Sequence, residues 1–169
     1  MSDVVSSAFT ALYVPFLASF VVLMLAAWRS PWVFVVFELM VIANDTGGWA
    51  LGVLFGKHPM APALSPKKSW EGFAGSALTS TAVGVVGLWL LGASWWWGVV
   101  AGVAIAFVGT MGDLTESLIK REAGLKDMSQ ILPGHGGVLD RVDALLMSAP
   151  VAYFIFAWAL PGIAWESSH

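Results

Sequence analysis

Long hydrophobic runs alternate with short polar segments along this chain. The runs cover residues 8–28, 32–55, 71–91, 98–118 and 140–160. Each run is about 20 residues long, which is the length that a helix needs to cross the hydrocarbon core of a bilayer. The third run is rich in Gly, Ala, Ser and Thr, as expected where membrane helices pack closely. The pattern predicts an all-α integral membrane protein: a bundle of about five transmembrane helices in one domain, residues 1–169, with a polar hairpin before the last helix.

Composition supports the membrane assignment. Hydrophobic residues make up 58% of the chain and charged residues 11%, with a mean hydropathy of +0.79. Soluble domains contain about 25% charged residues. The chain contains no cysteine, which excludes disulfides and thiolate chemistry. The net charge of −3 matters less than where the charges lie.

The basic residues are distributed unevenly between the loops. Five spans place the N-terminus, the 56–70 loop and the 119–139 hairpin on one side of the membrane. Of the eight Lys and Arg residues, all but Arg29 lie on that side, namely Lys57, Lys67, Lys68, Lys120, Arg121, Lys126 and Arg141. The positive-inside rule makes this side cytoplasmic. We therefore expect a multi-pass protein of the cell inner membrane whose polar segments face the cytoplasm.

An aspartate interrupts the second hydrophobic run. Asp45 lies about 12 residues into the run, where a charged side chain costs roughly 2.5–3.5 kcal/mol on insertion scales. One interpretation is a hydrogen-bonded polar residue that packs helices together. We favour the other, a metal or substrate ligand that faces a polar cavity.

Polar residues also cluster near the end of the fourth run. Asp113, Glu116, Ser117 and Lys120 recur at spacings of three and four, so they share one helix face. Glu116 and Lys120 alone are equally consistent with a surface ion pair. Asp113 lies deeper in the run and is the stronger candidate for a functional carboxylate.

The last run opens with two further carboxylates. Asp140 and Asp143 are three residues apart, and an acidic residue at a helix start is also explained by the helix dipole. Together with Asp113 of the preceding run, they are better explained by a hard cation, since Mg²⁺ takes carboxylate and phosphate oxygens. The sequence offers no His/Cys set typical of zinc.

Glycines and cations surround these carboxylates. The segment 133–137, Pro-Gly-His-Gly-Gly, precedes the last run, and glycines before a helix let backbone N–H groups approach a phosphate. The segment 65–72, Ser-Pro-Lys-Lys-Ser-Trp-Glu-Gly, adds cations and hydroxyls on the same side. An ordinary turn and positive-inside anchoring are the alternatives, and anchoring is preferred for Lys57. The combination suits a nucleoside triphosphate with Mg²⁺ and a second substrate in the membrane.

The polar hairpin carries a long motif. It comprises Ser117, Lys120, Arg121, Lys126, Asp127, Pro133, His135, Gly136, Gly137, Asp140, Arg141 and Asp143. The motif resembles the signature of the phosphatidate cytidylyltransferase (CDP-diacylglycerol synthase) family. Residues 44–49 and 65–72 resemble two further segments of that family, with Ser69 where the family usually has Thr. The resemblance covers roughly residues 33–160. Family members are usually longer, so this chain is expected to correspond to their C-terminal catalytic part.

The resemblance implies transfer of the cytidylyl group of CTP to phosphatidate, giving CDP-diacylglycerol and pyrophosphate, by a Mg²⁺-dependent nucleotidyltransferase of phospholipid biosynthesis. Catalytic roles are expected for Asp113, Asp140, Asp143, Lys120 and Arg121. Substrate binding is expected of Ser65, Lys67, Lys68, Ser117, Lys126, His135, Gly136, Gly137 and Arg141. The expected metal ligands are Asp113, Asp140, Asp143 and Asp45.

Two other functions fit parts of the pattern. A CTP-dependent polyprenol or phytol kinase would use a similar site, and a cation transporter would also place carboxylates in the membrane. The expected partners are CTP and membrane phosphatidate. A second cation and a homodimer stay open, and no nucleic-acid partner is expected.

Overall fold

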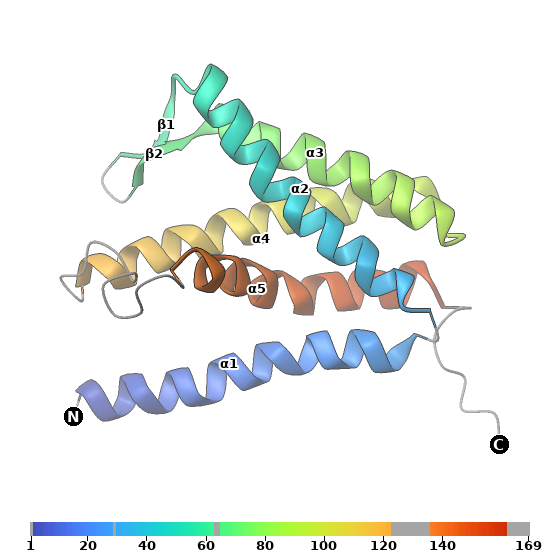
Figure 1. Ribbon diagram of the computed structural model, residues 1–169, viewed down its shortest axis with the longest axis horizontal. Helices are drawn as coiled ribbons and strands as arrows, with labels where there is room; N and C mark the ends of the chain where they lie inside the picture. The colour runs from blue at the N-terminus through green and yellow to red at the C-terminus, as the bar shows by residue number, and fades with distance from the viewer. Residues whose placement is uncertain (1, 29, 63–64, 123–135, 162–169) are drawn as a thin grey trace.

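The computed structural model describes residues 2–28, 30–62, 65–122 and 136–161, with side chains described except at 2–14, 66–67, 116, 119–122 and 136–144. Over these residues the chain forms five helices and a two-stranded hairpin (Figure 1). The helices are α1 (Ser2–Ala27), α2 (Trp32–Phe55), α3 (Trp70–Leu90), α4 (Trp95–Glu122) and α5 (Gly136–Ala159). Strands β1 (Pro59–Ala61) and β2 (Ser65–Ser69) pair antiparallel between α2 and α3.

The expected all-α membrane bundle is confirmed. Within the described residues, three helical segments are long and apolar enough to cross a membrane, namely α2, α3 and the Trp95–Thr115 part of α4. The described parts of α1 and α5 add the shorter apolar segments Pro15–Ala27 and Leu145–Ala159. Large hydrophobic side chains are exposed along all five helices, as suits surfaces that face lipid.

The segment 56–70 differs from the sequence prediction, which makes it a loop. Pro59 pairs with Ser69 and Ala61 with Ser65, and the Trp70 N–H donates to the His58 carbonyl oxygen at 3.0 Å. Strands of three and five residues that contain prolines and lysines lack the alternation by which strands are predicted. The hairpin is therefore determined by contacts with its surroundings rather than by local pattern.

The ends of three helices also differ from prediction. Helix α1 begins at Ser2, six residues before the expected start. The tryptophans at 95–97, expected in a turn, begin α4, and α4 continues to Glu122 instead of ending near residue 118. A tight turn makes the early start of α4 possible. Gly92 has a φ of +90°, and the N–H groups of Gly92 and Ala93 donate to Trp89 and Leu88, the pattern of a Schellman cap. Helix α5 begins at Gly136, four residues before the expected start.

Small residues bring α2, α3 and α4 into close contact. A Cβ added to Gly102 of α4 would lie 2.3 Å from the Cα of Thr81 in α3. A Cβ on Gly75 of α3 would lie 2.5 Å from the Gly47 carbonyl oxygen of α2. Backbone contacts of this kind require glycine. The opposite part of the bundle is packed by large side chains. The centroids of the Phe20 ring of α1 and of the Trp28 ring just after α1 lie 5.8 and 5.4 Å from the centroid of the Tyr153 ring of α5.

The polar elements gather at one end of the bundle. Figure 1 shows the hairpin, the C-terminal end of α4 and the start of α5 at its left side, while the α3–α4 turn and the end of α5 lie at the right. Between these ends α4 packs on both α3 and α5. This arrangement is the one expected from the order of the hydrophobic runs.

The close α3–α4 contact generates a stability prediction. Gly102→Ala should lower the free energy of unfolding by about 1–3 kcal/mol, because the new methyl group meets backbone that cannot yield without moving a helix. Gly112→Ala is the matched control on the same helix, since a Cβ there meets Met147 side-chain atoms at 3.5 Å or more. Thermal unfolding in detergent measures both. Equal stability of the two variants would contradict the packing described here.

Candidate active site

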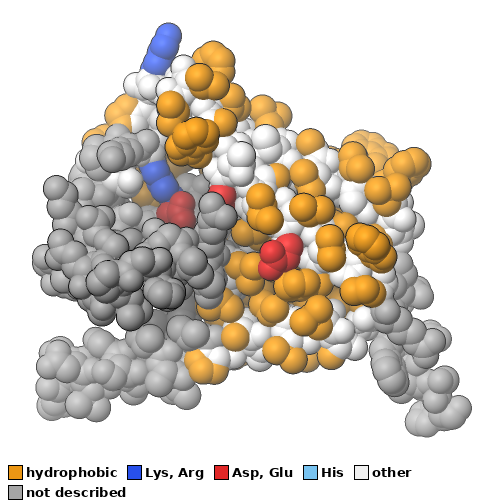
Figure 2. Space-filling view, in the orientation of Figure 1, with side chains coloured by type: hydrophobic (Ala, Val, Ile, Leu, Met, Phe, Trp, Pro, Cys, Tyr) orange, Lys and Arg blue, Asp and Glu red, His pale blue; other side chains and the backbone are white. Residues whose placement is uncertain are grey.

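A cleft of about 330 Å³ lies where the hairpin meets α2, α3 and α4. Its polar lining comprises Asn44, Asp45, Lys68, Ser69, Ser76, Thr110 and Asp113. Figure 2 shows a basic and an acidic side chain next to each other on a face that also carries many hydrophobic side chains. Charged groups in such surroundings are costly unless they pair or bind a ligand, so this cleft is the candidate active site.

Lys68 and Asp113 form an ion pair within the cleft. The Lys68 Nζ contacts the Asp113 Oδ2 and lies 3.5 Å from the Thr110 carbonyl oxygen. The two side chains are 25% and 47% exposed, so both remain within reach of a ligand entering the cleft. A phosphate would compete with Asp113 for the lysine, and a cation would compete with the lysine for the carboxylate.

Asn44 and Asp45 form the α2 wall of the cleft. Asn44 Nδ2 donates to Asp45 Oδ1 at 3.2 Å, and Ser76 Oγ of α3 donates to the Asn44 backbone oxygen at 2.7 Å. The Asn44 side chain is 6% exposed, and its Oδ1 accepts no hydrogen bond within the part of the chain that the structure describes. Asp45 also lines a smaller cavity of about 180 Å³ with Glu38 and Leu145. An amide oxygen next to a carboxylate is a suitable donor set for a hard cation.

The local sequence explains why the backbone at Lys68 has a defined position. Ser69 is the N-cap of α3, and its Oγ accepts a hydrogen bond from the Gly72 N–H at 3.1 Å. This capping ends β2 and starts the helix at a defined residue. Gly72 in turn packs against α2, because a Cβ there would lie 3.1 Å from the Gly48 carbonyl oxygen. Lys68 therefore directly precedes the N-cap of α3, and the first turn of α3 packs against α2.

Among the predicted site residues whose side chains the structure describes, Asp45, Lys68 and Asp113 line the cleft. Ser65 lies at the other end of β2, opposite Ala61, and Ser117 lies one turn beyond Asp113, where its Oγ donates to the Asp113 carbonyl oxygen at 2.7 Å. Neither is among the residues that line the cleft. Sequence reasoning overlooked Asn44, Ser76 and Thr110. The adjacency of an amide to Asp45 inside an apolar run was the available signal for Asn44.

The other predicted site residues are placed by backbone or lie outside the described residues. Lys67 lies on β2, and Lys120 and Arg121 lie in the last turn of α4. Gly136, Gly137, Asp140, Arg141 and Asp143 lie in the first turns of α5, whereas Lys126 and His135 fall outside the described residues. A Cβ at Gly112, next to Asp113, would lie 3.5 Å from Met147, which is four residues beyond Asp143. The α4–α5 contact thus places Gly112 beside Met147, which lies about one helical turn after Asp143 on α5.

The described side chains include no group of three His, Asp or Glu residues that could hold a metal ion. Two carboxylates, Asp45 and Asp113, line the cleft with the buried Asn44 oxygen. These oxygen donors fit Mg²⁺, which is usually bound by one or two carboxylates together with substrate phosphates. The contribution of Asp140 and Asp143 stays a prediction, because their side chains lie outside the described part.

Comparison with known proteins adds an independent result. Residues 1–159 match the cytidylyltransferase family. A phosphatidate cytidylyltransferase of Mycobacterium bovis is 48% identical over 157 residues, which are 92% of this chain and 51% of the relative. Proteins of the same name from Mycobacterium leprae and Haemophilus influenzae are 42% identical over 154 and 125 residues, covering 90% and 70% of this chain and 49% and 43% of the relatives. The chain spans about half the length of these curated relatives. It belongs to the cytidylyltransferase family.

Proposed function

We propose that this chain transfers the cytidylyl group of CTP to phosphatidate, producing CDP-diacylglycerol and pyrophosphate. The observation that carries the proposal is the cleft in which Lys68 meets Asp113 beside Asp45, at one end of an apolar helical bundle. A cation and carboxylates together suit a metal-bound triphosphate, and the bundle suits a lipid co-substrate. The names of the relatives support the same reaction.

The proposed reaction is an in-line displacement. An oxygen of the phosphatidate phosphate attacks the α-phosphorus of CTP, a new P–O bond forms, and the bond to the pyrophosphate oxygen breaks. The attacking oxygen is already anionic, so the protein needs little general-base chemistry. Its task is to position the substrates and to neutralise charge. Lys68 would hold phosphate oxygens of CTP, and Lys120 and Arg121 at the end of α4 would neutralise the leaving pyrophosphate.

Asp45 and Asp113, with Asp140 and Asp143 from α5, would hold Mg²⁺. A bound Mg²⁺ neutralises phosphate oxygens and makes the phosphorus more electrophilic. The carboxylates also keep the cleft selective, because an anionic substrate without its cation would be repelled. In this proposal the lysine side chain binds phosphate and the carboxylates bind the cation.

The cleft would face the cytoplasm, where CTP is found, in the inner membrane of a bacterium. The uneven distribution of Lys and Arg supports this orientation. Phosphatidate would reach the cleft from the bilayer that surrounds the bundle.

The reaction is tested with CTP labelled at one phosphorus. The purified chain, phosphatidate and Mg²⁺ are incubated with α-³²P-CTP or with γ-³²P-CTP, and the extracted lipid is counted. The proposal predicts lipid label from the α position and none from the γ position. Label from the γ position would identify a lipid kinase, and no lipid label from either would contradict the proposal.

Substitution of the carboxylates tests the proposed Mg²⁺ site. Asp113→Asn should lower kcat by about 10²-fold or more, the scale seen when one electrostatic stabiliser is removed, and should raise the Mg²⁺ concentration for half-maximal rate. Asp140→Asn and Asp143→Asn are expected to behave alike. Near-normal activity and Mg²⁺ dependence in all three would refute the metal assignment.

Lys68→Ala should raise the KM for CTP on the order of tenfold or more, because a charge-assisted hydrogen bond to phosphate is lost. Lys57→Ala is the matched control. Lys57 also lies between α2 and α3, but its side chain is exposed and does not line the cleft. Steady-state kinetics at varied CTP measure both, and equal KM values for the two variants would argue against a phosphate role for Lys68.

The orientation in the membrane can be read from single cysteines, since the chain has none of its own. Lys57→Cys lies on the hairpin side, and Ser94→Cys lies in the exposed α3–α4 turn. An impermeant maleimide added to intact cells, with the outer membrane permeabilised, should label residue 94 and spare residue 57. The reverse pattern would overturn the cytoplasmic placement of the cleft.

A further inference from the structure

A second polar cluster lies outside the cleft, at the junction of α2, the hairpin and α3. The Glu71 carboxylate accepts hydrogen bonds from the backbone N–H groups of Lys57 and His58, both at 3.2 Å to Oε2. Its Oε1 lies 2.5 Å from His58 Nδ1. The carboxylate of one α3 residue thus holds the segment that leaves α2. We refer to Glu71 and His58 with these contacts as the clamp.

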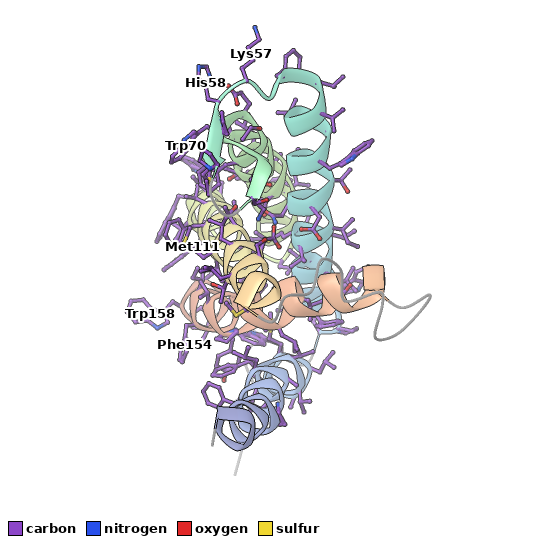
Figure 3. All side chains as sticks on the ribbon, turned by 90° about the vertical axis from the view of Figure 1, so that its left-hand side faces the viewer. Lys57, His58, Trp70, Met111, Phe154 and Trp158 are labelled. Carbon is purple, nitrogen blue, oxygen red and sulfur yellow. The ribbon has the colours of Figure 1, made fainter. Side chains whose placement is uncertain are left out.

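The clamp closes the open end of the hairpin. Beside it, the Trp70 N–H donates to the His58 carbonyl oxygen at 3.0 Å, and Pro59 pairs with Ser69. Lys68 directly precedes Ser69 on β2, and its side chain reaches Asp113 of α4. Figure 3 shows His58 and Trp70 on the same side of the hairpin and Lys57 pointing away from the bundle.

A hairpin this short needs an external anchor. Two strands of three and five residues are at best marginally stable alone in water. Their position relative to α4 therefore depends on the contacts at their ends. The described contacts at the open end include the Trp70–His58 backbone hydrogen bond, the Ser69 cap and the clamp, while the Lys68–Asp113 pair lies across the cleft.

We propose that Glu71 is a positioning residue that acts through Lys68. By fixing the connection from α2 against the start of α3, the clamp holds β2 at the place from which Lys68 reaches the cleft. Glu71 and His58 are not among the residues that line the cleft, so the role proposed for them is indirect. The inference rests on the proposed function, because it assigns Lys68 a role in phosphate binding.

Kinetics of a double-mutant cycle test how the clamp acts. Glu71→Ala should lower kcat/KM for CTP on the order of tenfold, the size expected from losing hydrogen bonds to one charged group. Glu71→Gln should lose less, because its amide oxygen still accepts from the backbone N–H groups. In a Lys68→Ala background, Glu71→Ala should have little further effect, since the residue through which it acts is absent. Full additivity of the two substitutions, or normal kinetics of Glu71→Ala, would overturn the proposal.

A labelling experiment reads the same inference without turnover. Lysine acylation of the intact protein, followed by mass spectrometry, should show faster modification of Lys68 in Glu71→Ala and in His58→Ala than in the unaltered chain. His58→Asn, whose amide can donate to Glu71, should restore the slow rate. Exposed Lys57 is the internal reference and should be modified equally in all variants. An unchanged Lys68 rate in both alanine variants would overturn the positioning role.

The two experiments separate the proposals. If the unaltered chain makes no CDP-diacylglycerol, the proposed function fails, while the acylation rates still report whether the clamp positions Lys68. If turnover is normal and the acylation rates do not respond to Glu71 or His58, the proposed function stands and the clamp inference fails.

Discussion

The ion pair between Lys68 and Asp113 is the interaction on which the cleft depends. It joins the hairpin to α4 across residues 45 positions apart in the chain, and it keeps two opposite charges together at the edge of an apolar bundle. A lone charge in this region would be unfavourable, so each partner stabilises the other. The pair is thus a structural contact and, in the proposed reaction, the resting state of a site for metal-bound phosphate.

The close helix contacts determine which other side chains share the cleft with this pair. Glycines let α2 and α3 approach to backbone contact beside the cleft, as at Gly48 and Gly72. This brings Asn44 and Asp45 of α2 within the same cleft as Asp113 of α4. Larger residues at these glycines would push the helices apart and separate the carboxylates. The small-residue packing of the bundle and the chemistry of the cleft are therefore coupled.

Hydrophobic pattern alone was sufficient to locate the helices. The run at 32–55 has the same bounds as α2, because Pro31 precedes it and Gly56 follows it as the C-cap. The hairpin could not be predicted in this way, since its position is set by the contacts of Glu71, Ser69 and Lys68 with other elements. The residue types of the site were also evident, but not the pairing of Lys68 with Asp113. Nothing in the local sequence indicates which of several lysines lies opposite which carboxylate.

The central claim is that the cleft beside Lys68 and Asp113 holds a metal-bound cytidine triphosphate. Anomalous diffraction from crystals grown with Mn²⁺ and a non-hydrolysable CTP analogue tests it most directly. The account predicts a manganese peak at ligand distance from the Asp113 carboxylate, with the Lys68 Nζ turned away from Asp113 and bound to the triphosphate. Nucleotide and manganese bound elsewhere, with the Lys68–Asp113 pair intact, would contradict it.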